Sequence, residues 1–222
     1  MRLRILFGLA GASLGLVGPS LANAQVSATA GPPACGRRCG TERWAVKTLT
    51  DTDTGEIVPV AVLTTVAALR GIPRPPPRAL PETRRVLNRD PAAQRMWAAT
   101  ERTIYLLHVM VVGWKAEADS DYHLVIADSG ALTRTMIVEA PNPRCARACA
   151  SAWAPAFAAV RASIRGILGL PPVRFRRLRR PVPVTLAGVG FFDVLHGQTG
   201  VAPNGLELHP LLTIVQEGPW RK

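Results

Sequence analysis

The sequence predicts a mainly β domain: an OB-fold-like five-stranded barrel with one helix between strands 3 and 4 and an N-terminal strand-helix addition. Three observations predict it. Five apolar runs rich in β-branched residues follow one another over residues 101–216, separated by turn residues. An alanine-rich run with helical periodicity lies between the third and the fourth of them. The first run is long and contains Gly113, where a strand can bend sharply.

The five strands are expected, in order, in "RTIYLLHVMVVGWKAEA", "DYHLVIAD", "TRTMIVEAP", "VPVTLAGVGFFDVL" and "LELHPLLTIV". The helix is expected in "CARACASAWAPAFAAVRASIRGIL". There Trp153, Phe157, Val160 and Ile164 follow at spacings of four, three and four residues and form one apolar face. Pro155 fits the first turn of such a helix. The core is expected to include Trp44, Trp97, Tyr105, Trp114 and Tyr122. A six-stranded sandwich is the alternative architecture.

The N-terminal addition is expected over residues 41–70. Alternating apolar and polar residues around Trp44 and Val46 predict a strand over residues 41–53. A short helix is expected over residues 64–69, with Thr64 or Thr65 as its cap. Residues 71–100 are expected to form an extended connector, because five prolines lie between positions 73 and 81.

The first 24 residues have the features of a secretory signal peptide. Arg2 and Arg4 precede an apolar run over residues 5–17, and a small-residue site ends at Ala24, after which cleavage is expected. The apolar run is too short to span a bilayer, and no transmembrane span is expected elsewhere. The mature protein is therefore expected to be exported, to the periplasm or the extracellular space. Residues 25–40 are expected to form a flexible leader.

Four cysteines form two C-x3-C pairs, Cys35 with Cys39 and Cys145 with Cys149. In an exported chain such cysteines predict disulfides. If the two segments lie antiparallel, Cys35 pairs with Cys149 and Cys39 pairs with Cys145. This is our preferred one of three possible connectivities. A zinc site with four thiolate ligands is the alternative.

Three segments, "CGTERWAVKT", "EADSDYHLVIAD" and "FFDVLHGQTGVAPNGLELHP", occur in this order in the chain. Together they resemble a family of exported bacterial proteins to which no reaction is assigned. The resemblance covers residues 39–215 by order. It implies a barrel-like domain and does not specify an activity.

Candidate metal ligands and catalytic groups lie in the second and third of these segments. In the second, Lys115, Glu117, Asp119, Asp121 and His123 offer oxygen and nitrogen ligands for a cation, although such a stretch is also an ordinary hairpin turn. In the third, strand alternation places Glu207 and His209 on one face.

If that face and the face of His123 meet at one end of the barrel, the three side chains could bind a metal. Asp193 and His196 could then act as a general base or orient a metal ligand. The candidate catalytic residues are therefore His123, Asp193, His196, Glu207 and His209. The alternative is a structured loop held by the side chains of Gln198 and Asn204.

The chain is strongly basic, with a formal net charge of +12. Many of its arginines lie in "RFRRLRRP", between the predicted helix and the fourth strand. Guanidinium groups bind phosphates and carboxylates. The candidate ligand-binding residues are Arg174, Arg176, Arg177, Arg179, Arg180, Gln198 and Asn204. A solvated arginine-rich surface is the alternative.

The sequence contains no G-x-S-x-G nucleophile motif, no phosphate-binding P-loop and no dinucleotide fingerprint, which disfavours the enzyme classes that use them. We predict an exported, non-catalytic binding module for an anionic ligand: an envelope polymer, a lipid or a nucleic acid. The first alternative is a metal-dependent hydrolase that uses His123, Glu207 and His209. The second is a structural protein that docks a partner through residues 73–81. No cofactor other than a divalent metal is expected.

Overall fold

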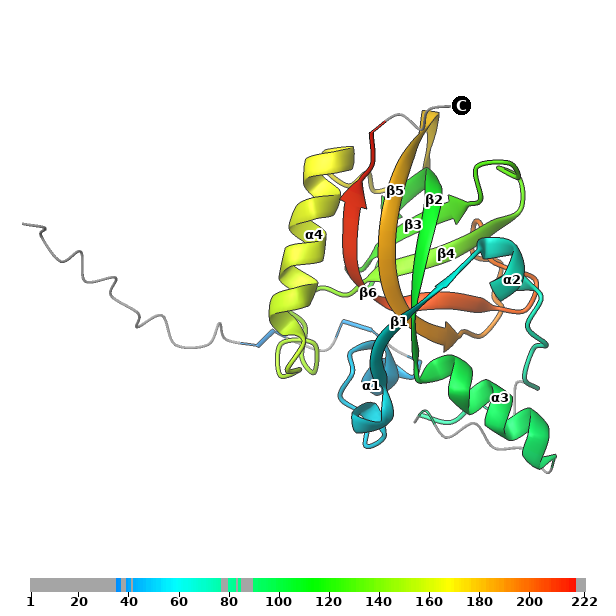
Figure 1. Ribbon diagram of the computed structural model, residues 1–222. Coiled ribbons are helices and arrows are strands. Elements are labelled where there is room, and N and C mark those ends of the chain that lie inside the picture. Colours follow the sequence, from blue (N-terminus) through cyan, green and yellow to red (C-terminus); the bar gives the residue numbers. More distant parts are fainter. Residues whose placement is uncertain are drawn as a thin grey trace, which may run out of the picture. The chain divides into compact units, whose positions relative to one another are not determined.

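A computed structural model describes residues 35–36, 39–40, 42–76, 80–82, 84 and 90–218 (Figure 1). All of them belong to the second of two units in the chain, residues 33–222. The predicted signal peptide, most of the leader and the middle of the proline-rich stretch, residues 77–79, lie outside the described residues.

Six strands form one sheet, which confirms a mainly β fold. They are β1 (Val58–Thr64), β2 (Thr103–Ala116), β3 (Tyr122–Ala127), β4 (Thr135–Ala140), β5 (Arg176–Phe192) and β6 (Leu206–Gln216). The hydrogen-bonded order is β1-β2-β3-β4-β6-β5, and β2 also pairs with β5. β1–β2 and β4–β6 are parallel, and the other pairs are antiparallel. Strands β2 to β6 correspond to the five predicted runs, and β1 joins the same sheet as a sixth strand.

The helix predicted between the third and fourth runs is α4 (Ala154–Leu168), which lies alongside β6 (Figure 1). Its residues Phe157, Val160 and Ile164 are buried as predicted, while Trp153 precedes the first turn. The short helix α2 (Val66–Arg70) is also confirmed, and Thr65 caps it by accepting a hydrogen bond from the Ala68 amide at 3.1 Å.

The strand predicted over residues 41–53 is wrong. This segment forms the one-turn helix α1 (Trp44–Lys47) and turns, followed by a 3-10 turn, η1 (Thr54–Glu56). Arg43 and Leu49 have φ values of 51° and 54°, which a strand does not accommodate. Trp44 and Val46, two positions apart, lie on nearly opposite sides of this turn and are both buried, so apolar residues alternate with others as they would in a strand.

The connector predicted over residues 71–100 is wrong at its C-terminal end, where α3 (Pro91–Glu101) forms. The Asp90 side chain accepts a hydrogen bond from the Ala92 amide at 2.9 Å and caps the helix, and Pro91 occupies its first position. On α3, Trp97 is buried and donates its indole N–H to the Pro73 carbonyl. The proline-rich stretch is thereby held against the domain where it is described.

The aromatic residues predicted in the core, Trp44, Trp97, Tyr105, Trp114 and Tyr122, are all buried. The predicted irregularity of the first long strand is confirmed as a register shift between Val111 and Gly113 in β2. A side chain at position 113 would collide with the ring of Phe175, so glycine lets β5 approach this bend.

The two disulfides have the preferred connectivity, Cys35–Cys149 and Cys39–Cys145. They tie the segment before α1 to the loop between β4 and α4, and they leave no thiolates for the zinc alternative among the described residues. Two disulfides fit an oxidising environment outside the cytosol. Within the described part of the chain, no helix has the length and apolarity needed to cross a membrane.

Candidate functional site

Two buried histidines converge on the carboxylate of Glu139. His123 on β3 is the cross-strand partner of Glu139 on β4, and His209 lies on β6, the other neighbour of β4. His123 Nδ1 lies 2.8 Å from Glu139 Oε1, and His209 Nδ1 lies 3.2 Å from Glu139 Oε2. Each oxygen of one carboxylate therefore contacts one imidazole.

A second carboxylate faces each histidine. Glu117 Oε1 lies 3.2 Å from His123 Nδ1, and Glu207 Oε1 lies 3.4 Å from His209 Nδ1. The Nε2 atom of His123 donates to the Thr199 carbonyl at 2.9 Å, which orients its ring. The two imidazoles thus have closely similar surroundings on either side of Glu139.

The surroundings of His209 Nε2 differ in one respect. Asp121 Oδ2 lies 3.4 Å from this nitrogen, yet within the described part of the chain neither atom has a hydrogen-bond partner of acceptable geometry. Both side chains are completely buried. Buried polar atoms without partners are rare, because leaving them unpaired costs about 1–3 kcal/mol each. These two atoms therefore mark a position where a ligand would satisfy them.

The pKa values of the two histidines and of Glu139 are strongly shifted in this cluster. Burial acts to lower the pKa of His123, but hydrogen bonds to Glu117 and Glu139 outweigh it and raise that pKa to about 10. Burial also acts against the charged form of His209, and its carboxylate neighbours raise its pKa well above 6.5. Burial would raise the pKa of Glu139, but the two histidines hold it well below 4.5.

Two other carboxyl groups, those of Glu207 and Asp119, lie close to further negative charges, and their pKa values are raised. Burial, together with the negative charges of Asp193 and Glu139, raises the pKa of Glu207 to about 8. Burial and the charge of Asp121 raise the pKa of Asp119 to about 6. The carboxyl groups of the cluster are Glu117, Asp119, Asp121, Glu139, Asp193 and Glu207, whereas its cationic side chains are Lys47, Lys115, His123 and His209. A metal ion that replaces a histidine proton would keep the carboxylates of this cluster compensated.

An open cleft of about 640 Å³ leads to the cluster. It is lined by Cys39, Glu42, Lys47, Lys115, Glu117, Ala118, Asp119, Glu139, Asp193, His196, Gly197, Gln198 and Thr199. Glu139 is only 8% exposed, but it forms part of this lining. Solvent therefore reaches the carboxylate that joins the two histidines.

Lys47 brings a positive charge to the same cleft. Its Nζ lies 3.8 Å from Asp193 Oδ1, and its side chain is buried. Burial acts to lower the pKa of Lys47, but the charges of Asp193 and Glu207 outweigh it and raise the pKa above 10.5. This ammonium group is suited to bind an anionic part of a ligand in the cleft.

The predicted site residues separate into groups. His123, Glu207 and His209 lie together, as the hydrolase alternative requires, although all three are buried beneath the cleft. Asp193 lines the cleft wall, and His196 is exposed in the same lining. Gln198 also lines the cleft, where it donates to Asp193 Oδ2 at 3.2 Å.

Asn204 and the arginine segment lie elsewhere. Asn204 is buried and donates to the carbonyls of Leu69 and Ile72 at 2.9 and 2.8 Å, which fixes the loop after β5 on α2. The arginines 174, 176, 177, 179 and 180 are exposed. The sequence predicted that these arginines lie before the fourth strand. In the structure that strand, β5, begins earlier than predicted, at Arg176, so all of them except Arg174 lie within it.

Two members of the site were not found in the sequence, Glu139 and Lys47. Glu139 had a usable signal, because it is a lone carboxylate inside the apolar run "TMIVEAP" and such a residue needs a buried partner. Lys47 had none, because the predicted strand would have pointed it away from its apolar neighbours.

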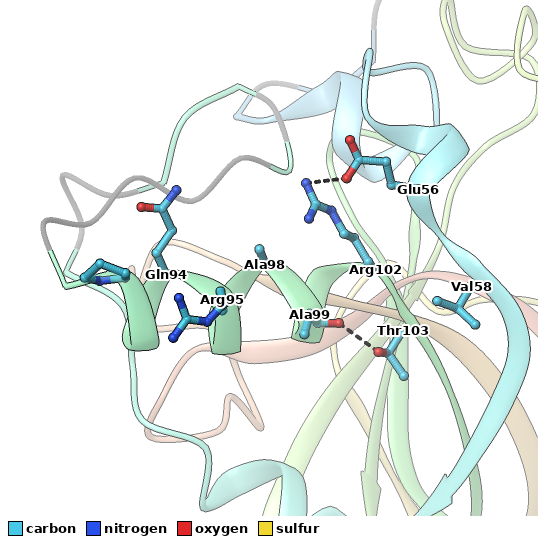
Figure 2. Close-up of a pocket in the computed structure, with 9 residues that line it drawn as sticks. Glu56, Val58, Gln94, Arg95, Ala98, Ala99, Arg102 and Thr103 are labelled. Atoms are coloured by element: carbon cyan, nitrogen blue, oxygen red, sulfur yellow. Dashed lines mark hydrogen bonds and ion pairs between the residues drawn. The ribbon is translucent and has the colours of Figure 1, made fainter.

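A larger cavity of about 710 Å³ lies between α3 and the start of β1 (Figure 2). Its lining is mostly small or aliphatic, with Gln94 and Arg95, and Arg102 is paired with Glu56 at 2.6 Å. Among the described residues that line it there is no histidine, cysteine or aspartate. Its side chains therefore do not offer a metal-ligand or nucleophile set.

The described residues contain two sets that could hold a metal ion: Glu117, His123 and Glu139, and Asp121, Glu139 and His209. In each set, one ligand atom per residue lies within 4.8 Å of the others. Comparisons of the chain with protein-family models, with curated proteins and with solved structures find no match.

Proposed function

We propose that this chain is an exported metal-dependent hydrolase in which Glu117, His123 and Glu139 hold a divalent cation at the wall of the cleft. One observation carries the proposal. His123 Nδ1 faces oxygens of both glutamates, at 3.2 and 2.8 Å, while its Nε2–H is donated to the Thr199 carbonyl. Histidines that ligate metals typically donate their other ring N–H to such an acceptor.

The donor set suits a borderline or hard cation such as Zn²⁺ or Mn²⁺. Binding would replace the proton on His123 Nδ1, as metal binding to histidine does generally. Three protein ligands leave coordination positions open towards the cleft. A cation there would supply Lewis-acid chemistry for the addition of water to an ester or phosphoester, whose leaving group takes up the proton that water releases.

The chain's own residues have roles in this proposal. Lys47 would bind a negatively charged part of the substrate, held in place by Asp193. His196, exposed in the cleft lining, would transfer a proton.

Export after cleavage following Ala24 belongs to the same proposal and is supported by the two disulfides. An OB-like barrel of β2 to β6, with β1 added, is supported by the β2–β5 pairing that returns the strand order to β2.

The test is metal content. Residues 25–222 are produced in an oxidising compartment, equilibrated with Zn²⁺ or Mn²⁺, desalted and analysed by plasma mass spectrometry. We expect bound metal in the wild type and its loss in His123→Ala. His108→Ala is the matched control, because His108 is an exposed histidine that pairs with Glu217 outside the cleft lining. Wild-type protein that retains no metal would contradict the proposal.

Activity is then measured on bis(p-nitrophenyl) phosphate and p-nitrophenyl acetate. Turnover by the loaded wild type and by His108→Ala, with none by His123→Ala, is the expected result. Bound metal without turnover of either probe would leave metal binding established and contradict hydrolysis of these ester classes.

We propose anion binding by the arginine segment as a second function. The observation in its favour is that all five arginines are exposed: Arg174 just before β5, and the other four along its start, where the extended backbone directs them to both faces. Removing Arg177, Arg179 and Arg180 together should weaken binding to single-stranded DNA or phosphatidylglycerol vesicles and flatten its salt dependence. The control removes the same charge from exposed Arg95, Arg134 and Arg144. Equal losses in both triple variants would reduce the effect to net charge.

A further inference from the structure

The cluster contains more ligand atoms than one cation at His123 would use. Beyond Glu139 lie His209 and Asp121, completely buried, with Glu207 beside them. His209 Nδ1 is within 3.2 Å of Glu139 and 3.4 Å of Glu207. On its other side, Nε2 and Asp121 Oδ2 face each other at 3.4 Å without a hydrogen bond.

This spacing is that of two ligands of one ion rather than of a hydrogen-bonded pair. A metal bonded to both atoms at about 2.0–2.2 Å would place them roughly 3 Å or somewhat more apart. It would also satisfy both orphaned atoms at once, whereas a water molecule would need further polar partners. Glu207 Oε1, 3.4 Å from Nδ1, would then accept the remaining ring proton, the arrangement that typically orients a ligating histidine, and would leave Glu139 free to contact the ion.

We infer that Asp121 and His209 hold a second divalent cation, with Glu139 shared between it and the cation at His123. This inference rests on the proposed function for the first cation. Glu139 is the common member of both ligand sets, and its two oxygens face the two histidines separately. A carboxylate shared in this way joins two metal ions into one centre, the arrangement that in hydrolases stabilises both the attacking and the leaving oxygen.

Backbone features support the geometry of the second position. Asp121 Oδ1 accepts the Asn142 amide at 3.0 Å, which leaves Oδ2 directed towards His209. The ring of Phe191 packs edge-on against the His209 imidazole, with centroids 5.6 Å apart, and limits its rotation. The two ligands are therefore held in place by contacts that do not depend on the ion.

The experiment measures stoichiometry in the disulfide-bonded protein, residues 25–222. Mn²⁺ binding is followed by equilibrium dialysis and by electron paramagnetic resonance, which distinguishes a spin-coupled pair from isolated Mn²⁺. We expect two Mn²⁺ per wild-type chain with a coupled signal. Asp121→Asn should retain one Mn²⁺ with the six-line signal of an isolated ion, because Asn keeps the shape and loses the charge.

The matched control is Glu56→Gln, the same carboxylate-to-amide change at a residue that lies outside the cleft lining and belongs to neither ligand set. It should keep both ions and the coupled signal. One Mn²⁺ in the wild type, unchanged in Asp121→Asn, overturns the second site and leaves the first intact. No Mn²⁺ at all overturns the proposed function and this inference with it. If Asp121→Asn does not fold, the wild-type count and signal still decide between one ion and two.

Discussion

Buried charged side chains occur in different arrangements in this protein, among them the cluster below the cleft and the ion pair of Arg43 and Glu101. In the cluster below the cleft, acidic groups outnumber cationic ones. Beside β5, Arg43 and Glu101 form a closed pair instead: Arg43 Nη1 donates to Glu101 Oε1 at 2.6 Å, and Nη2 donates to Oε2 at 2.7 Å. Glu101 also accepts the Phe192 amide at 2.9 Å. This pair is saturated by its protein partners, and it therefore serves structure rather than ligand binding.

Glu101→Gln should destabilise the fold by about 3–5 kcal/mol, because it leaves the buried Arg43 charge uncompensated. Urea unfolding followed by tryptophan fluorescence measures the change. The control is Glu56→Gln, which breaks the partly exposed pair with Arg102 at 2.6 Å and should cost less than about 1 kcal/mol. Equal losses in the two variants would show that the buried Arg43–Glu101 pair contributes no more to the free energy of unfolding than a partly exposed pair does.

At the scale of elements, α2 depends on a residue far from it in the chain. Its first amides, those of Val66 and Ala67, donate to the two oxygens of Asp128 at 3.0 and 2.9 Å. Asp128 follows β3, so this contact attaches α2 to the end of that strand. The helix is too short to be stable alone, and its N-terminal amides need these acceptors.

Asp128→Ala should therefore destabilise the protein by about 1–2 kcal/mol, the usual cost of losing a helix cap. Ser129→Ala, at the exposed neighbouring position, should change the free energy of unfolding by less than about 0.5 kcal/mol. Amide hydrogen exchange at Val66 and Ala67 should accelerate in the first variant only. Unchanged protection there would mean that Asp128 does not hold the helix.

The sequence predicted correctly those elements that are determined by residues close to one another in the chain. The face of α4 and the cap at Thr65 follow from residues within a few positions of one another, and both are confirmed. α1 is different, because the positive φ values at Arg43 and Leu49 arise from tertiary contacts, including the Trp44 indole bonded to the Ala146 carbonyl. The same holds for the site. Strand alternation predicted that Glu207 and His209 share a face. Glu139 lies beside them because β4 pairs in parallel with β6, and a pairing between distant segments cannot be predicted from a local pattern.

For the whole molecule, two disulfides connect the N-terminal segment to the loop before α4 at neighbouring points. Removing either pair by Cys→Ser substitution should cost about 3 kcal/mol on chain-entropy grounds, because the remaining bond leaves only a short loop to be closed. Removing both should cost roughly 7 kcal/mol, because the long loop is then open as well. Urea unfolding of the three variants measures these values. Negligible loss in the double-pair variant would mean that the segment before α1 does not depend on its covalent attachment.

Strand β1 differs from the rest of the sheet, and this bears on how the whole molecule behaves at high concentration. It lies at the end of the strand order, and among the described strands it pairs with β2 alone. Its sequence is apolar, yet nearly all of it is exposed, with Val60 at 67%. An exposed apolar edge strand is a template for pairing with another chain, and natural proteins often protect such an edge with lysine.

Val60→Lys should therefore raise the temperature at which light scattering appears on heating, with little change in the unfolding midpoint. Val60 lies in the irregular stretch between Val58 and Ala61, so the substitution should not disturb the regular pairing with β2. Leu170→Lys is the control, because Leu170 is 80% exposed but lies in the loop between α4 and β5. If both lysines suppress scattering equally, added charge is the cause; if only Val60→Lys does so, β1 is the segment through which the chains associate.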